Sequence, residues 1–167
     1  MPKHSAGLLM FRKRAGQVEV LLAHPGGPFW ARKGQGAWTI PKGEVGESED
    51  ALTTAKRELE EETGIAPTGS LLPLGSIKQK GGKTVEAWAF EGDCDPASIK
   101  SNTFTLEWPP RSGKMREFPE IDRAKFFKMD EAQQYINSAQ AGFLAKLVQL
   151  LNTQHFHCAE QPITFPK

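Results

Sequence analysis

The chain of 167 residues contains little cysteine and no long apolar run. Its two cysteines, Cys94 and Cys158, stand far apart and in no spacing typical of a metal site, which predicts two free thiols in a reducing compartment. No apolar stretch approaches the roughly 20 residues that a membrane-spanning helix needs. The apolar run near the start is too short for a signal peptide and soon meets basic residues. We therefore expect a cytoplasmic protein with no membrane partner.

The chain also lacks a strong excess of charge of either sign. It carries 21 basic and 20 acidic side chains, for a net charge of +1. Proteins that hold nucleic acid by bulk electrostatics are usually clearly basic, so no stable nucleic-acid partner is expected. A few local charges can still bind a nucleotide-sized ligand. The length corresponds to about one domain, and the hydrophobic share of 38% is ordinary for a globular protein.

Short apolar segments separated by glycine and proline are the main signal of local structure. They predict strands at residues 5–12, 17–24, 71–79, 83–91, 103–108 and 125–128. Helices are expected at residues 48–63, 129–137 and 141–151, followed by a tail at 153–167. Ser48 and Asp130 are the expected N-caps of the first two helices, and Gly64 is the expected stop of the first. This order of elements predicts an α+β fold or a mixed-sheet sandwich.

The first predicted helix ends in a concentration of acid, KRELEEETGI at residues 56–65. At about 100° per residue, Glu58, Glu61 and Glu62 fall on one arc, and Glu60 falls on the far side. The adjacent arc is apolar and should face the core: Leu52, Ala55 and Leu59. Three converging carboxylates raise one another's pKa unless a cation offsets them, and hard divalent cations prefer oxygen ligands. On this geometry alone, a metal site and a solvated acidic face both stay open.

A longer pattern surrounds this acidic segment. Residues 43–65, GEVGESEDALTTAKRELEEETGI, resemble the Nudix box, G-x5-E-x7-R-E-U-x-E-E-x-G-U, in which U is a bulky aliphatic residue. Every specified position is filled: Gly43, Glu49, Arg57, Glu58, Leu59, Glu61, Glu62, Gly64 and Ile65. The preceding WTIPKGE and the later EIDRAKFFKMDEA also resemble segments of Nudix hydrolases. The resemblance extends from residue 4 to about residue 152.

The resemblance implies an α/β/α sandwich of the α+β class, with a mixed sheet and the box as a loop–helix–loop. It implies one domain over residues 1–152 and a tail over 153–167. It further implies hydrolysis of a nucleoside diphosphate linked to another group, with Mg²⁺ or Mn²⁺ as cofactor. The metals would stabilise the charge on the pyrophosphate oxygens and orient the attacking water. Many family members form homodimers, so a homodimer is a possible assembly.

The resemblance also assigns roles to single residues. It implies that Glu58, Glu61 and Glu62 are metal ligands and that the carbonyl of Gly43 or Lys42 is a further ligand. Arg57 is implied to orient these acids and to pair with Glu49.

The general base is left open among three glutamates. In some relatives the base matches Glu58, and in others it lies on a loop after the box. Glu117 and Glu120 are the candidates on such a loop, and each could instead be an ordinary surface acid. Glu120 is preferred, because Pro119 would fix its backbone.

The loop at residues 25–38 and the adjoining Lys42 supply the candidate substrate contacts. Lys42 and Arg32 can hold phosphates, and aromatic rings can stack on a base. For Trp38 core packing is the competing interpretation, and for Phe29 and Trp30 it is anchoring of the loop.

The substrate itself stays open among a dinucleoside polyphosphate, a nucleotide sugar and a nucleoside triphosphate. The tyrosine that diadenosine polyphosphate hydrolases often carry some 16–18 residues past the box is missing, because the single tyrosine is Tyr135. The proline that ADP-ribose hydrolases often carry there is missing as well. A non-catalytic nucleotide-sensing Nudix domain is the alternative function, and the presence of every box acid argues against it.

Overall fold

The structure is a computed structural model that describes residues 3–157. Its centre is a six-stranded mixed sheet in the order β4-β5-β1-β2-β8, with β3 paired to β1 beside this path. The strands are β1 (His4–Arg14), β2 (Gln17–Pro25), β3 (Lys42–Glu44), β4 (Leu72–Lys78), β5 (Thr84–Glu91) and β8 (Ile121–Lys128). The β1–β5 pair is parallel, and the other pairs are antiparallel.

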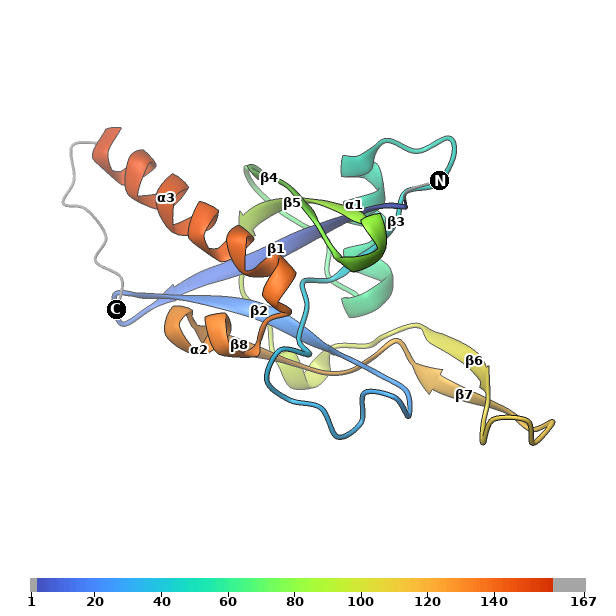
Figure 1. The fold of residues 1–167 in the computed structure, drawn as a ribbon. Helices are drawn as coiled ribbons and strands as arrows, with labels where there is room; N and C mark the ends of the chain where they lie inside the picture. Colours follow the sequence, from blue (N-terminus) through green and yellow to red (C-terminus); the bar gives the residue numbers. More distant parts are fainter. Residues whose placement is uncertain (1–2, 158–167) are drawn as a thin grey trace.

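Three α-helices flank this sheet: α1 (Ala51–Thr63), α2 (Met129–Tyr135) and α3 (Ala141–His157). Figure 1 shows α1 on one side of the sheet and the pair α2 and α3 on the other. Two further strands, β6 (Thr103–Glu107) and β7 (Met115–Pro119), form a separate hairpin that extends away from the sheet (Figure 1). Single 3₁₀ turns, η1 (Lys80–Gly82), η2 (Pro96–Ser98) and η3 (Ser138–Gln140), complete the described elements.

Strand β1 is buried on both faces and separates two layers of core. Leu9 and Phe11 pack into the layer covered by α2 and α3. Leu8 and Met10 point the other way, into the layer that contains Ala55 and other apolar residues of α1. A central strand covered on both faces reads as a continuous apolar run, which is why residues 5–12 show little alternation. The arrangement confirms the predicted α+β sandwich with a mixed sheet.

Several predicted boundaries were wrong. Helix α1 begins at Ala51, and its N-cap is Asp50, whose side chain accepts from the backbone N–H of Thr53, so Ser48 is not the cap. Helix α2 is capped by Lys128 without a side-chain bond, so Asp130 lies inside the helix rather than capping it. The predicted strand 125–128 is the end of the longer β8.

The last helix is longer than expected, and two short strands were missed. Helix α3 continues to His157 instead of ending at residue 151. The rest of the predicted tail, including Cys158, lies outside the described residues. Strands β3 and β7 were not predicted, since each is short and carries polar residues on its exposed side. In residues 3–157, no helix is both long and apolar enough to cross a membrane.

Candidate active site

Helix α1 aims the acids because its other side is fixed in the core. Ala55 and Leu59 are fully buried, and Glu60 is exposed, as the helical periodicity predicts. The left-handed conformation of Gly64 (φ 78°) ends the helix, and its N–H donates to the carbonyl of Glu60. The Asp50 cap and the Gly64 stop therefore fix the length of the helix, and its buried face fixes the direction in which the acids project.

Arg57 holds three of the acids together. Its Nε and Nη2 donate to the two carboxylate oxygens of Glu49 at 2.9 and 2.8 Å. Its Nη1 donates to Glu58 at 3.1 Å and to Glu61 at 3.0 Å. The bidentate bond from Arg57 lowers the pKa of Glu49 to about 2. Glu49, Glu58 and Glu61 in turn raise the pKa of Arg57. The pairing implied by the family resemblance is thus present, and it braces the loop before α1 against the helix.

The backbone of β3 lies directly against the Glu58 carboxylate. A Cβ built on Gly43 would overlap the carboxylate group of Glu58. The φ of Gly43 is not in the left-handed region, so space rather than conformation requires glycine here. Burial, together with the charges of Glu61 and Glu120, raises the pKa of Glu58 against the opposing effect of Arg57.

Glu62 is the most strongly perturbed acid of the group. Burial and then the charges of Glu58 and Glu120 raise its pKa to about 8. Its Oε2 accepts from the backbone N–H of Lys42 at 3.1 Å. Burial lowers the pKa of Lys42 to about 8, and the nearby Lys83 adds to this effect. A carboxylate and an ammonium that are both partly desolvated thus lie at the start of β3.

Glu120 comes from a distant part of the chain to join these acids. Its N–H donates to the carbonyl of Asn102 at 2.8 Å, and its carbonyl accepts from Gly26 at 2.9 Å. A Cβ on Gly26 would overlap the carbonyl of Pro119, so glycine permits this close approach. Burial and the charge of Glu61 raise the pKa of Glu120. The other candidate on this segment, Glu117, is exposed on β7 and does not join the group.

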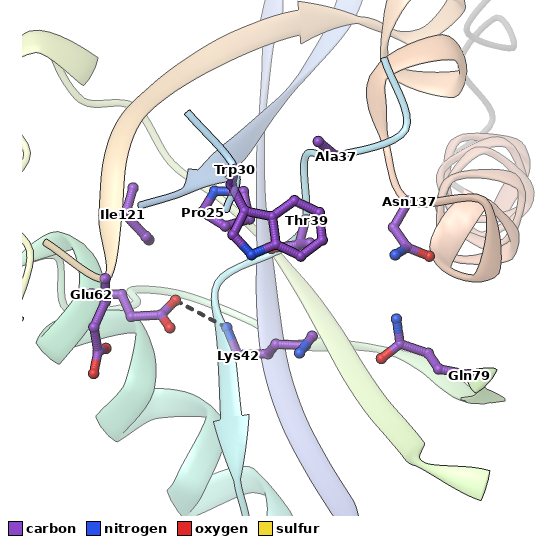
Figure 2. Close-up of a pocket in the computed structure, with 10 residues that line it drawn as sticks. Pro25, Trp30, Ala37, Thr39, Lys42, Glu62, Gln79, Ile121 and Asn137 are labelled. Atoms are coloured by element: carbon purple, nitrogen blue, oxygen red, sulfur yellow. Dashed lines mark hydrogen bonds between the residues drawn. The ribbon is translucent and has the colours of Figure 1, made fainter. Parts of the chain in front are cut away.

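A cavity of about 290 Å³ opens beside Glu62 and Glu120. Its lining comprises Pro25, Trp30, Ala37, Thr39, Lys42, Glu62, Gln79, Glu120, Ile121 and Asn137. Figure 2 shows the indole of Trp30 above the side chain of Lys42, which runs from the Glu62 side of the cavity toward Gln79. One wall is thus aromatic, one end is acidic and the floor is basic, a combination suited to a base joined to phosphates.

The loop that carries Trp30 is held by a buried histidine. His24 is fully buried, and its Nε2 donates to the carbonyl of Lys33 at 2.6 Å. Its Nδ1 lies 2.8 Å from Oδ1 of Asp122 on β8. The ammonium of Lys33 lies 4.9 Å from the ring centre of Trp30. The loop is therefore tied at its middle to the same strand that follows Glu120.

The other predicted substrate contacts lie elsewhere. Trp38 is 6% exposed and packs edge-on against His24 and Phe127, so core packing, the competing interpretation, is what the structure shows. Phe29 is 60% exposed and contacts Trp108, with ring centres 5.4 Å apart, outside the cavity lining. Arg32 is exposed and does not line the cavity. Lys42 does line it, and among the loop aromatics Trp30 takes the place that Trp38 and Phe29 were expected to hold.

The donor set fits a hard divalent cation. Four carboxylates can contribute oxygen ligands: Glu58, Glu61, Glu62 and Glu120. After burial, the charges of neighbouring members of this group raise the pKa of Glu58, Glu62 and Glu120. Such mutual repulsion is relieved by a bound cation. Within residues 3–157, no three acidic, imidazole or thiol groups are already arranged as a metal site. Arg57 contacts Oε1 of Glu58 and Oε2 of Glu61, and Oε2 of Glu62 accepts from the backbone of Lys42.

Sequence reasoning missed two polar residues of the cavity. Gln79 follows β4, and Asn137 follows α2, and their side chains face each other beyond the tip of Lys42 (Figure 2). Neither stands in a motif, and they meet only because η3, which Asn137 caps, lies against β4 and the turn after it. No local signal in the sequence could have found them.

Comparison with known proteins identifies the fold and family. The model of the NUDIX domain family matches residues 1–147. An RNA pyrophosphohydrolase of Alkalilimnicola ehrlichii is 46% identical over 52 residues, which cover 30% of this chain and 29% of that protein. The chain therefore spans less than a third of the length of that relative in the match.

Solved structures of low sequence identity share the fold. A C. elegans Ap4A hydrolase in a binary complex superposes with a TM-score of 0.63 at 23% identity, covering 88% of this chain and 97% of that one. The NUDIX domain of Shewanella oneidensis NrtR, complexed with ADP ribose, gives a TM-score of 0.64 at 15% identity and covers 90% and 89%. With the family match over residues 1–147 and the complete box over residues 43–65, the chain belongs to the Nudix hydrolase family.

Proposed function

We propose that this protein is a divalent-metal-dependent pyrophosphohydrolase of nucleotides. The observation that carries the proposal is the group of Glu58, Glu61, Glu62 and Glu120, of which Glu62 and Glu120 line one end of a cavity with an aromatic wall and a basic floor. A structural acidic helix would place its carboxylates in solvent, yet burial raises the pKa of both Glu58 and Glu62. Desolvated acids beside a cavity are typical of a reactive site.

Glu58, Glu61 and Glu62 are the proposed metal ligands, with the carbonyl of Gly43 or Lys42 as a further ligand. Mg²⁺ or Mn²⁺ bound there would neutralise pyrophosphate oxygens and polarise the attacking water. The close approach of the Gly43 backbone to Glu58 supports placing both on one ion. Arg57 would keep Glu58 and Glu61 oriented through the contacts that it already makes, with Glu49 fixing the guanidinium.

Glu120 is the preferred general base. Its raised pKa keeps its basicity closer to neutral pH than that of an exposed glutamate, which favours proton transfer from water. Backbone hydrogen bonds to Asn102 and from Gly26 fix the main chain of Glu120, and so fix the point from which its side chain extends. Glu58 is the competing base, and the exposed position of Glu117 argues against that residue.

Trp30 and Lys42 are the proposed substrate contacts. The indole of Trp30 lies across the cavity from the Lys42 side chain (Figure 2), so a base can stack on the ring while its phosphates reach the ammonium. The relatives are compatible with this class of ligand. One is an RNA pyrophosphohydrolase, one an Ap4A hydrolase, and one was solved with ADP ribose.

The sharpest test compares two neighbouring glutamates of α1. Activity is measured on a panel of nucleotides with Mg²⁺ or Mn²⁺, using isotopically labelled water to locate the phosphorus attacked. Glu62→Gln should lose most of the activity, about 100-fold or more, because a ligand beside the reacting groups is removed. Glu60→Gln is the matched control and should stay close to wild type, since Glu60 is exposed on the far side.

The alternative, a nucleotide-sensing domain without turnover, makes a different prediction. It requires saturable nucleotide binding and no metal-dependent hydrolysis of any panel member. Equal losses in Glu60→Gln and Glu62→Gln would refute the assigned ligand set. Mn²⁺ that fails to raise the melting temperature would argue against a metal site altogether, because a ligand of the folded state stabilises it by mass action.

A further inference from the structure

A second cavity of about 320 Å³ continues from the first. Its lining comprises Gln79, Lys80, Lys83, Asn137, Ser138 and Ala139. Gln79 and Asn137 line both cavities, so the two adjoin at this pair of amides. Figure 2 shows both amides beyond the end of the Lys42 side chain that lies farther from Glu62. A ligand that begins at the acidic group and follows Lys42 therefore arrives at the second cavity.

The second cavity is basic and contains no acid. Neither Asp nor Glu is among its lining residues, whereas two of the six are lysines. None of the ion pairs found in the described part of the chain involves Lys42, Lys80 or Lys83. Lysines gathered at one cavity repel one another unless an anion lies between them.

The backbone of the β4–β5 turn fixes the positions of the Cα atoms of Lys80 and Lys83. The β4–β5 turn closes through the N–H of Gln79, which donates to the carbonyl of Lys83 at 2.7 Å. Gly81 and Gly82 adopt positive φ values of 84° and 80°, which favour glycine. Both lysines therefore start from a tight turn at the cavity wall.

Asn137 is positioned as a donor to this space. Its Oδ1 accepts from the N–H of Ala139 at 2.9 Å, and its backbone N–H donates to the carbonyl of Trp38 at 2.7 Å. The side-chain NH₂ is turned toward the side of Gln79 and Lys42 (Figure 2), and Asn137 lines both cavities. Ammonium and amide donors without a carboxylate are the groups that bind phosphate oxygens.

We propose that the second cavity binds the phosphates that continue beyond the cleaved anhydride, so that the preferred substrates carry a chain of three or more phosphates. Nucleotides joined to a sugar through a diphosphate would leave this cavity without an anion. The inference rests on the proposed function, because it assumes that cleavage occurs beside Glu58, Glu61 and Glu62. Both a dinucleoside polyphosphate and a nucleoside 5′-triphosphate offer the required chemistry.

The test measures kcat/KM with Mg²⁺ for diadenosine compounds of two to five phosphates, ATP and UDP-glucose. Wild type should prefer the longer chains over the diphosphate-linked compounds. In the double variant Lys80→Gln/Lys83→Gln, the ratio of tetraphosphate to diphosphate activity should fall about 10- to 100-fold, chiefly through KM, because charged donors to the distal phosphates are lost. Lys78→Gln is the control: Lys78 is exposed, belongs to the same turn region and lines neither cavity.

The identity of the long-chain ligand is decided within the same panel. Preference for the dinucleoside compounds would indicate that a second nucleoside is also held, and preference for ATP would indicate that the chain ends in the second cavity. An unchanged tetraphosphate-to-diphosphate ratio in the double variant would overturn the inference, as would a wild-type preference for UDP-glucose.

A binding experiment separates this inference from the proposed function. Inorganic tripolyphosphate is titrated into wild type and the double variant by calorimetry, with Mg²⁺ present and folding checked by thermal denaturation. A Kd that rises at least tenfold in the double variant supports the second cavity as a phosphate site even if no panel member is hydrolysed. An equal Kd in both proteins overturns it even if the enzyme is active.

Discussion

Replacing Gly43 by alanine should separate activity from stability. The added Cβ would overlap the Glu58 carboxylate, so the carboxylate must swing away. The cost to folding is small: an off-rotamer side chain costs about 0.5–1.5 kcal/mol, and a weakened bond from Arg57 about as much. Alanine recovers about 0.5–1 kcal/mol of backbone entropy, because Gly43 has an ordinary φ in a paired strand. We therefore expect a net loss of about 0–2.5 kcal/mol.

The loss of activity should be much larger. A displacement of about 1 Å in a group that positions the reaction costs on the order of 100-fold. Here the displaced group is Glu58, a proposed metal ligand. The assay pairs kcat/KM on the best substrate with denaturant unfolding of the metal-free protein.

Gly34→Ala is the control for this comparison. A Cβ on Gly34 would have no neighbour within 4 Å, and its φ is also ordinary, so both activity and stability should stay close to wild type. The reasoning would be refuted if Gly43→Ala kept its activity within about threefold. It would also fail if the loss of activity merely followed a comparable loss of folded protein.

Three further predictions concern neighbouring side chains. Trp30→Ala should raise KM by about 5- to 150-fold at nearly constant stability, because a stacking face is lost. Trp38→Ala should instead cost about 3–5 kcal/mol of folding free energy, because it empties a core position. Steady-state kinetics and denaturant unfolding distinguish the two effects. Burial raises the pKa of Glu62 from 4.5 to about 8, so between these pH values the metal-free folded state holds a proton that the unfolded chain has released. Its stability should therefore fall as the pH rises through that window, and fall less in Glu62→Gln, as measured by thermal denaturation with a chelator present. Arg57 lowers the pKa of Glu49 from 4.5 to about 2, so the stabilisation by this pair is present above pH 4.5 and lost toward pH 2, and Glu49→Gln should flatten that acid limb.

Each of these predictions has an outcome that contradicts it. An unchanged KM in Trp30→Ala would show that the indole ring does not contact the substrate. A pH dependence in Glu62→Gln as steep as that of wild type between pH 4.5 and 8 would mean that Glu62 is not the group responsible. An acid limb in Glu49→Gln that matches wild type would mean that the contact with Arg57 contributes nothing to stability in solution.

The box helix was the most predictable part of the molecule. Helical periodicity alone put Glu58, Glu61 and Glu62 beside Ala55 and Leu59, because a helix repeats its geometry at every turn. The first residue of α1 could not be placed as well, since Ser48 and Asp50 are both good caps and the loop geometry chooses between them.

The cavity wall was less predictable, because it depends on contacts between distant segments. Trp30 and Trp38 lie in one loop, and only the packing of Trp38 on Phe127 and His24 decides which ring remains at the cavity. Glu120 could be preferred over Glu117 from its neighbour Pro119, but the acceptor role of its carbonyl toward Gly26 appears only in the fold.

Arg57 has a consequence for how the family box can vary in evolution. The Arg57 guanidinium donates hydrogen bonds to Glu49, Glu58 and Glu61 at once. Replacing Arg57 therefore removes the cationic partner of all three carboxylates. The effects of substitutions at these four positions are therefore expected to be non-additive. A lineage that exchanged any one of them would pass through weakened intermediates, and the four residues should be inherited as a single unit.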